Sequence, residues 1–155
     1  MILVVAEPRD GRLNRATWET LAAAQQLAGG APITVVVPGA GGQAVATELA
    51  GGGVEEVLLA EHAALAPYTP QAFTMALRAI VERVSPAFVL LPHTYQTRDF
   101  APMLAARMRK ALVTDVTGIN GTGAGATFLR PMFQGKLVAE VRPSGVGPVL
   151  ITSQI

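Results

Sequence analysis

The chain has 155 residues, half of them hydrophobic and 15% charged, with a formal net charge of +1. This length and composition predict one folded domain over residues 1–155 and exclude a disordered tail, and the scattered basic residues argue against nucleic-acid binding. The chain has no cysteine, which excludes disulfides, thiolate metal sites and cysteine nucleophiles.

The first two-thirds of the chain alternates short apolar runs with segments of helical periodicity. The apolar runs predict buried strands, and turn or capping residues separate them from the helices. In chain order the strands are expected at residues 2–6, 33–37, 57–59, 88–91 and 112–119. The helices are expected to begin after Asn14, near Gln43, at Pro70 and near Asp99, each with an apolar face.

The C-terminal third has a different rhythm, because strand-like segments follow one another without helices between them. Residues 127–133, 137–142 and 149–152 have the composition of strands, and glycine-containing turns separate them. We expect these three segments to form antiparallel hairpins.

Repeated strand–helix–strand units predict a parallel sheet with right-handed crossovers and helices on both faces. The expected fold is an α/β, doubly wound three-layer sandwich of the Rossmann-like kind, with antiparallel strands added at the C-terminal end. Such sheets bind ligands beyond the carboxyl ends of their strands, at a switch in strand order. The residues expected at this candidate nucleotide pocket are Ala6, Glu7, Gly39, His93, Gln96, Thr97, Arg98 and Asp115.

Each of these residues also has a purely structural interpretation. Gly39 opens a glycine cluster, and its position after the second strand favours a turn into a helix over a dinucleotide fingerprint. In the polar loop, Thr97 or Asp99 could cap the next helix, and Arg98 could be solvated or could pair with an anion. His93 would need a carboxylate such as Asp115 to act as a base, so a surface or capping role is favoured. No metal site is expected.

Arg130 lies in an apolar antiparallel strand, where a charged side chain needs a partner. An interface ion pair and a plain exposed position account for it equally well. Together with Phe133 and Lys136 in the same segment, Arg130 is a candidate interface residue.

Four pieces of the sequence carry a family resemblance. They are the opening Ile-Leu-Val-Val-Ala-Glu, TRDFAPMLAARM at 97–108, LVTDVTGI at 112–119 and RPMFQG at 130–135. In this order and spacing they resemble the N-terminal domain of the electron-transfer-flavoprotein α subunit, whose pieces read approximately GKDLAPRLAARL, LVSDV and RPIYAGN. The resemblance implies an adenine-nucleotide α-hydrolase-like fold and a heterodimer with a β subunit. It also implies one FAD and electron transfer from acyl-CoA or other dehydrogenases to a membrane-bound quinone reductase.

The family holds FAD mainly in a C-terminal domain, which we expect to be absent here because the chain ends at Ile155. No cofactor is therefore expected on this chain alone. Lys136 stands where the family often has Asn. The loop at 95–98 looks in part like the nucleotide-phosphate loop of the β subunit, which leaves an AMP or ATP site open.

The preferred function is a scaffold that assembles with a β-subunit-like chain and a FAD-binding domain for electron transfer. The alternative is a stand-alone adenine-nucleotide-binding module of the universal-stress-protein kind. An enzyme in its own right is not expected, because the sequence has no nucleophile–base pair or metal set. Apolar edge strands also favour a homodimer. The sequence lacks a signal peptide or an apolar run of about 20 residues, so we expect a cytoplasmic protein without membrane insertion.

Overall fold

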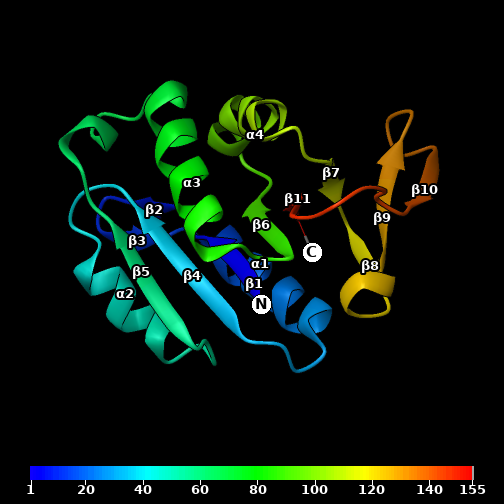
Figure 1. The fold of residues 1–155 in the computed structure, drawn as a ribbon, viewed down its shortest axis with the longest axis horizontal. Coiled ribbons are helices and arrows are strands. Elements are labelled where there is room, and N and C mark those ends of the chain that lie inside the picture. Colours follow the sequence, from blue (N-terminus) through cyan, green and yellow to red (C-terminus); the bar gives the residue numbers. More distant parts are fainter. Residues whose placement is uncertain (155) are drawn as a thin grey trace.

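Six parallel strands form the central sheet, in the order β5-β4-β1-β6-β11-β7. The computed structural model describes residues 1–154, and Figure 1 shows the sheet running across the molecule. The strands are β1 (Ile2–Val5), β4 (Ile33–Pro38), β5 (Glu56–Ala60), β6 (Phe88–Pro92), β7 (Leu112–Val116) and β11 (Val149–Ser153). The order reverses between β1 and β6, so the switch point of the sheet lies between these two strands.

Helices cover both faces of this sheet, as predicted. They are α1 (Arg15–Ala28), α2 (Gln43–Ala50), α3 (Pro70–Val84) and α4 (Tyr95–Met108), with short 3-10 turns η1 (Ala63–Leu65) and η2 (Gly123–Gly125). Alternate residues of β1 face opposite layers: Ile2 and Val4 pack in the core of α1 and α2, while Leu3 and Val5 pack in the core of α3 and α4. The three-layer α/β/α fold is therefore confirmed. None of the helices among residues 1–154 combines the length and the apolarity that crossing a bilayer requires.

The helix starts are encoded locally. Asn14 caps α1, with its side-chain oxygen accepting a hydrogen bond from the Ala16 amide at 3.1 Å, and Pro70 occupies the first turn of α3. The predicted start of α4 near Asp99 was wrong. The helix begins at Tyr95, because Thr94 caps it by accepting a hydrogen bond from the Thr97 amide at 3.2 Å.

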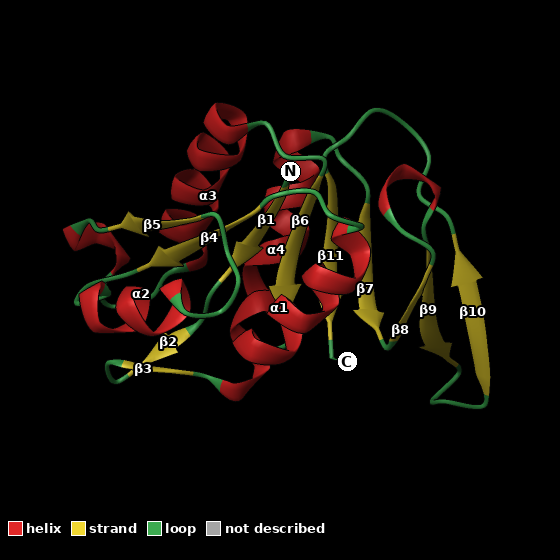
Figure 2. Ribbon diagram, turned by 90° about the horizontal axis from the view of Figure 1, so that it is seen from below, coloured by secondary structure: helices red, strands yellow, loops and turns green. Residues whose placement is uncertain are grey.

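A second sheet lies beyond β7, at the side of the molecule away from β5 (Figure 2). It is antiparallel in the order β10-β9-β8, with β8 (Gly118–Asn120), β9 (Thr127–Met132) and β10 (Leu137–Val141). The predicted strand at 112–119 is therefore two strands, because Asp115 adopts a left-handed backbone (φ 59°) at the end of β7. A two-stranded ribbon, β2 (Pro8–Arg9) and β3 (Arg12–Leu13), connects β1 to α1.

The prediction that the last strand joins an antiparallel hairpin was wrong. β11 runs parallel to both of its neighbours in the central sheet, pairing with all of β6 and, through Leu150 and Ile151, with β7. Both of these side chains are completely buried, one on each face. β6 and β7, which are consecutive in the chain, are thus separated in space by a strand that is added last.

Shortening Ile151 to Ala should lower the free energy of unfolding by about 2–5 kcal/mol, because it opens a cavity in the middle of the sheet. Urea denaturation monitored by circular dichroism measures this loss. Val138→Ala removes methyl groups from an exposed position in β10 and should change stability by less than about 0.5 kcal/mol. Equal effects of the two substitutions would contradict the central position of β11.

Candidate functional site

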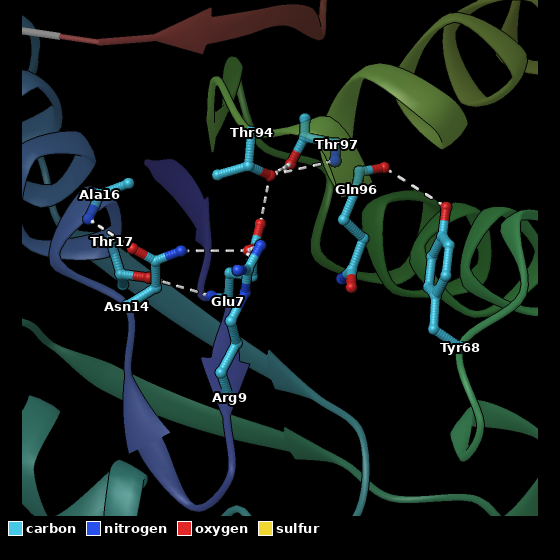
Figure 3. Close-up of polar contacts among 9 residues, drawn as sticks. All are labelled: Glu7, Arg9, Asn14, Ala16, Thr17, Tyr68, Thr94, Gln96 and Thr97. Carbon is cyan, nitrogen blue, oxygen red and sulfur yellow. Dashed lines mark hydrogen bonds and ion pairs between the residues drawn. The ribbon is translucent and has the colours of Figure 1, made fainter.

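The carboxyl ends of β1, β6, β11 and β7 lie along one edge of the sheet, where the sequence analysis predicted the site. At the switch point, Glu7 lies two residues beyond the end of β1, and its side chain is only 3% exposed. A buried carboxylate must be supplied with donors. Glu7 has three of them. Oε1 accepts from Arg9 Nε (3.0 Å) and Asn14 Nδ2 (3.1 Å), and Oε2 accepts from the Thr94 hydroxyl (Figure 3).

The Glu7 network ties together elements that are far apart in sequence. Its backbone amide donates to Thr17 Oγ1 of α1 at 3.0 Å, and its carbonyl accepts from the Asn14 amide at 3.1 Å. Thr94 both donates to Glu7 and caps α4, so the carboxylate lies at the helix N-terminus, where a phosphate would bind in a nucleotide-binding protein of this architecture. The position at the switch point is thus filled by the chain's own negative charge.

The first turn of α4 is also fixed from α3's side of the sheet. The Tyr68 hydroxyl donates to the Asp99 carboxylate at 2.8 Å and lies 3.3 Å from the backbone carbonyl of Gln96. Burial, together with the nearby Asp99 carboxylate, raises the pKa of the Tyr68 phenol well above its usual value. Thr97 is buried and does not cap the helix, and residues 95–98 of the predicted polar loop form the first turn of α4.

The glycine cluster is the turn into α2 that the sequence favoured. Gly39 and Gly41 have left-handed backbones (φ 121° and 73°), and the Gly42 amide donates to the Glu61 carboxylate at 3.3 Å. Gly39 and Gln96 line a pocket of about 350 Å³ that is separate from His93, Arg98 and Asp115. Here too, a carboxylate of the chain meets the helix amides.

His93 and Asp115 do approach each other, although their strands are not adjacent. Thr152 of β11 lies between them: its Oγ1 accepts from the Asp115 amide at 3.0 Å and is 2.8 Å from His93 Nδ1. His93 Nε2 lies 3.8 Å from Asp115 Oδ1, which also accepts from Gln154 Nε2. Burial is the main cause that lowers the pKa of His93. The Arg98 and Arg130 guanidinium groups lower it further, while Asp115 opposes the shift.

Arg130 belongs to the same site as His93, which the sequence did not reveal. Together with His93, Arg98, Asp115 and Thr152, it lines a pocket of about 280 Å³ between α4, β7 and β9. The Nε atom of Arg130 is buried and has no hydrogen-bond partner among residues 1–154. A buried donor left unpaired costs about 1–3 kcal/mol, so this group is poised to receive an acceptor.

Phe133 and Lys136, the other two interface candidates, lie in the exposed turn between β9 and β10. Phe133 is 69% exposed, and its backbone is left-handed (φ 51°), a conformation that costs a bulky residue about 1–2 kcal/mol. Leu137 and Val138 on β10 are 60% and 63% exposed. These three apolar side chains, which we call the hairpin patch, are exposed at one end of the second sheet, with Leu137 and Val138 on opposite faces of β10.

Of the predicted site residues, His93, Arg98 and Asp115 come together, and Glu7 and Thr97 form the buried network beside them. Ala6 is buried in the core. Gly39 and Gln96 line the other pocket. Sequence reasoning missed the roles of Thr94, Thr152 and Tyr68 and the contact of the Asn14 cap with Glu7. A threonine two residues after β6 was the available signal for Thr94, whereas Thr152 depended on the position of β11.

Replacing Glu7 with Ala should lower the free energy of unfolding by about 1–3 kcal/mol, because Asn14 and Thr94 lose their buried acceptor. Chemical denaturation measures the loss. The matched control is Glu82→Ala, which removes an exposed helical ion pair with Arg78 and should cost about 0.3–0.5 kcal/mol. A Glu7→Ala protein as stable as the control would show that the network does not stabilise the fold.

The stability of the fold should depend on pH through His93. Because the folded-state pKa lies below the ordinary value of 6.5, the unfolded chain binds the proton first as the pH falls. The contribution of His93 to the free energy of unfolding is complete above the pKa that His93 has in the unfolded chain, and it is lost as the pH falls below that pKa. Between about pH 7.5 and 5.5, the unfolding free energy of His93→Gln should fall less than that of the wild type. Parallel curves for wild type and His93→Gln would contradict the lowered pKa.

Comparison with known proteins gives the family. The sequence model described as "Electron transfer flavoprotein domain" matches residues 2–154. The electron transfer flavoprotein subunit alpha of Bacillus subtilis is 34% identical over 140 residues, which are 90% of this chain and 43% of that protein. The subunit alpha of Syntrophomonas wolfei is 33% identical over 149 residues, 96% of this chain and 46% of that protein.

A third relative has a different name. The acryloyl-CoA reductase electron transfer subunit beta of Anaerotignum propionicum is 30% identical over 121 residues, 77% of this chain and 33% of that protein. The chain thus spans less than half the length of these curated relatives. The match along nearly the whole chain agrees with the parallel sheet and the order of the sequence pieces, and we conclude that the chain belongs to the electron transfer flavoprotein family, with the likeness to its α subunits that the sequence indicated.

Proposed function

We propose that this domain acts as a scaffold in an electron-transfer-flavoprotein assembly, in which it docks to a β-subunit-like chain and to a FAD-binding domain. Electrons would pass from dehydrogenases to FAD in the assembly, and this chain would orient the parts rather than catalyse a reaction. The observation that carries the proposal is the hairpin patch, a strained and exposed phenylalanine next to exposed Leu137 and Val138. The names of the relatives support a role in electron transfer.

The residues of this chain do not fit a flavin dinucleotide. A dinucleotide presents its pyrophosphate to helix N-termini, and the Glu7 and Glu61 carboxylates lie at those of α4 and α2. These carboxylates already accept the hydrogen bonds that a pyrophosphate would need at the two helix starts. FAD in this proposal is therefore held by another domain of the assembly, and no electron-transfer step is assigned to residues of this chain.

The Glu7 carboxylate also disfavours the alternative, a stand-alone module that binds AMP or ATP. An adenine nucleotide would have to displace the Glu7 carboxylate from Asn14 and Thr94 before its phosphate reached α4. Isothermal titration with ATP and AMP decides the matter, and saturable heat from either nucleotide would favour the alternative. A homodimer through the free edge of β10, and a cytoplasmic location, stay predictions.

The scaffold proposal is tested by affinity purification from extract of the source organism, with the tagged 155-residue chain as bait. Mass spectrometry should identify a β-type subunit of the electron transfer flavoprotein family in the eluate, accompanied by flavin absorbance. An eluate in which no chain of this family is enriched over a tag-only column would overturn the proposal.

The substitution Phe133→Asn distinguishes an effect on partner binding from an effect on the stability of the fold. Asn tolerates the left-handed backbone better than Phe, so the variant should gain about 1 kcal/mol of stability on its own. It should nevertheless retain at least about tenfold less β-type subunit, since an aromatic anchor is lost. Met75→Gln is the control, because Met75 is 66% exposed on α3, away from the hairpin patch. Undiminished retention by Phe133→Asn would remove the hairpin patch from the interface.

A further inference from the structure

Two arginines without a carboxylate partner line one pocket. Among residues 1–154, Arg9, Arg15 and Arg78 form ion pairs with glutamates and the other arginines form none, but of these only Arg98 and Arg130 share this pocket. Arg98 and Arg130 have no acidic group within ion-pair distance in the part of the chain that the structure describes, and both line the 280 Å³ pocket with His93 and Asp115. The buried Nε of Arg130 has no hydrogen-bond acceptor, which is a second observation, besides the two arginines, that points to a bound acceptor in this pocket.

The charges of the pocket favour a ligand with a single negative charge. Arg98 and Arg130 are both positive, Asp115 is negative, and His93 is neutral near pH 7 because burial lowers its pKa. Asp115 is already engaged by Gln154 and faces His93 rather than either arginine. The pocket therefore has one uncompensated positive charge, which one carboxylate neutralises. A phosphate dianion would leave an excess negative charge beside Asp115.

The size and the surroundings of the pocket indicate where the carboxylate comes from. At about 280 Å³ the pocket holds a side-chain carboxylate, and it is smaller than the roughly 300–1,000 Å³ of sites that enclose whole small molecules. Arg130 lies on β9, the strand that leads into the exposed Phe133 of the hairpin patch. A protein that covers the hairpin patch would thus bring its own side chains to the mouth of the pocket.

We propose that the pocket lined by Arg98 and Arg130 receives one Asp or Glu carboxylate from the chain that docks on the hairpin patch. The planar guanidinium of Arg130 would donate through its buried Nε, and Arg98 would close the pair from α4. The identity of the docking chain rests on the proposed function, whereas the ability of the pocket to bind a carboxylate does not.

The pocket is tested first on the isolated 155-residue chain, with acetate as the probe. Nuclear magnetic resonance follows the Arg130 Nε–Hε signal while sodium acetate replaces sodium chloride at constant ionic strength. We expect a saturable shift in the wild type. Arg130→Gln is followed through the backbone amide of Thr152 and Arg98→Gln through either signal, and each should weaken acetate binding at least about tenfold.

Arg83→Gln is the matched control, because Arg83 is exposed on α3 and outside the pocket, and it should bind acetate like the wild type. A wild-type shift that does not saturate, or one that persists in both pocket variants, overturns the proposal. Inorganic phosphate is titrated in parallel. Phosphate binding about tenfold tighter than acetate would make the pocket a phosphate site and would equally overturn the carboxylate assignment.

The second arm uses the complex captured by affinity purification. Arg130→Glu should reduce the retained β-type subunit at least about tenfold, and Arg83→Glu should leave it unchanged. The two proposals fail separately. If no family partner is captured but acetate binds, only the scaffold proposal is lost. If the partner is captured equally by wild type and Arg130→Glu, and acetate does not bind, only the carboxylate pocket is lost.

Discussion

A carboxylate that is withdrawn from water must be met by hydrogen-bond donors, and the position of Glu7 imposes this requirement at the centre of the molecule. Its donors come from the β2–β3 ribbon, from the cap of α1 and from the cap of α4. One buried charge thus fixes how three separate segments leave the switch point of the sheet. Asn14 and Thr94 each serve twice, since they start a helix and satisfy the carboxylate at the same time.

In this chain, carboxylates of the protein itself occupy the helix N-termini at which related architectures bind ligands. The Gly42 amide at the start of α2 faces Glu61, and the caps of α1 and α4 at the switch point both face Glu7, so these helix N-termini meet carboxylates of the chain. The unpaired guanidinium Nε of Arg130 and the exposed hairpin patch lie to one side of these helix starts. The groups that remain free to bind other molecules therefore lie at the border with the second sheet rather than in the middle of the sheet edge.

The sequence predicted the parallel sheet and its helices because each element carries its own local signal, such as the continuous apolar run of β1 or Pro70 at the start of α3. The position of β11 carries no such signal. The sequence of residues 149–152 predicts a strand whichever strands it pairs with. Nothing in this local sequence distinguishes a hairpin from insertion between β6 and β7. The candidate site could not be predicted fully for the same reason, because Thr152 and Arg130 come near His93 only through long-range strand pairing. The left-handed backbone of Asp115, which redirects the chain into β8, also has no signal in the local sequence.

The place of β11 also has a consequence for the order in which the protein can be assembled. Within the central sheet, β7 is hydrogen-bonded to β11 and to no other of the described strands. During synthesis on the ribosome, β1 to β6 can pair as they emerge, but β7 cannot join the central sheet until residues 149–153 are released. The border with the second sheet, with the arginine pocket, then closes after the rest of the central sheet, and a nascent chain stalled before Val149 would expose the unpaired edge of β6 to chaperones and to other chains.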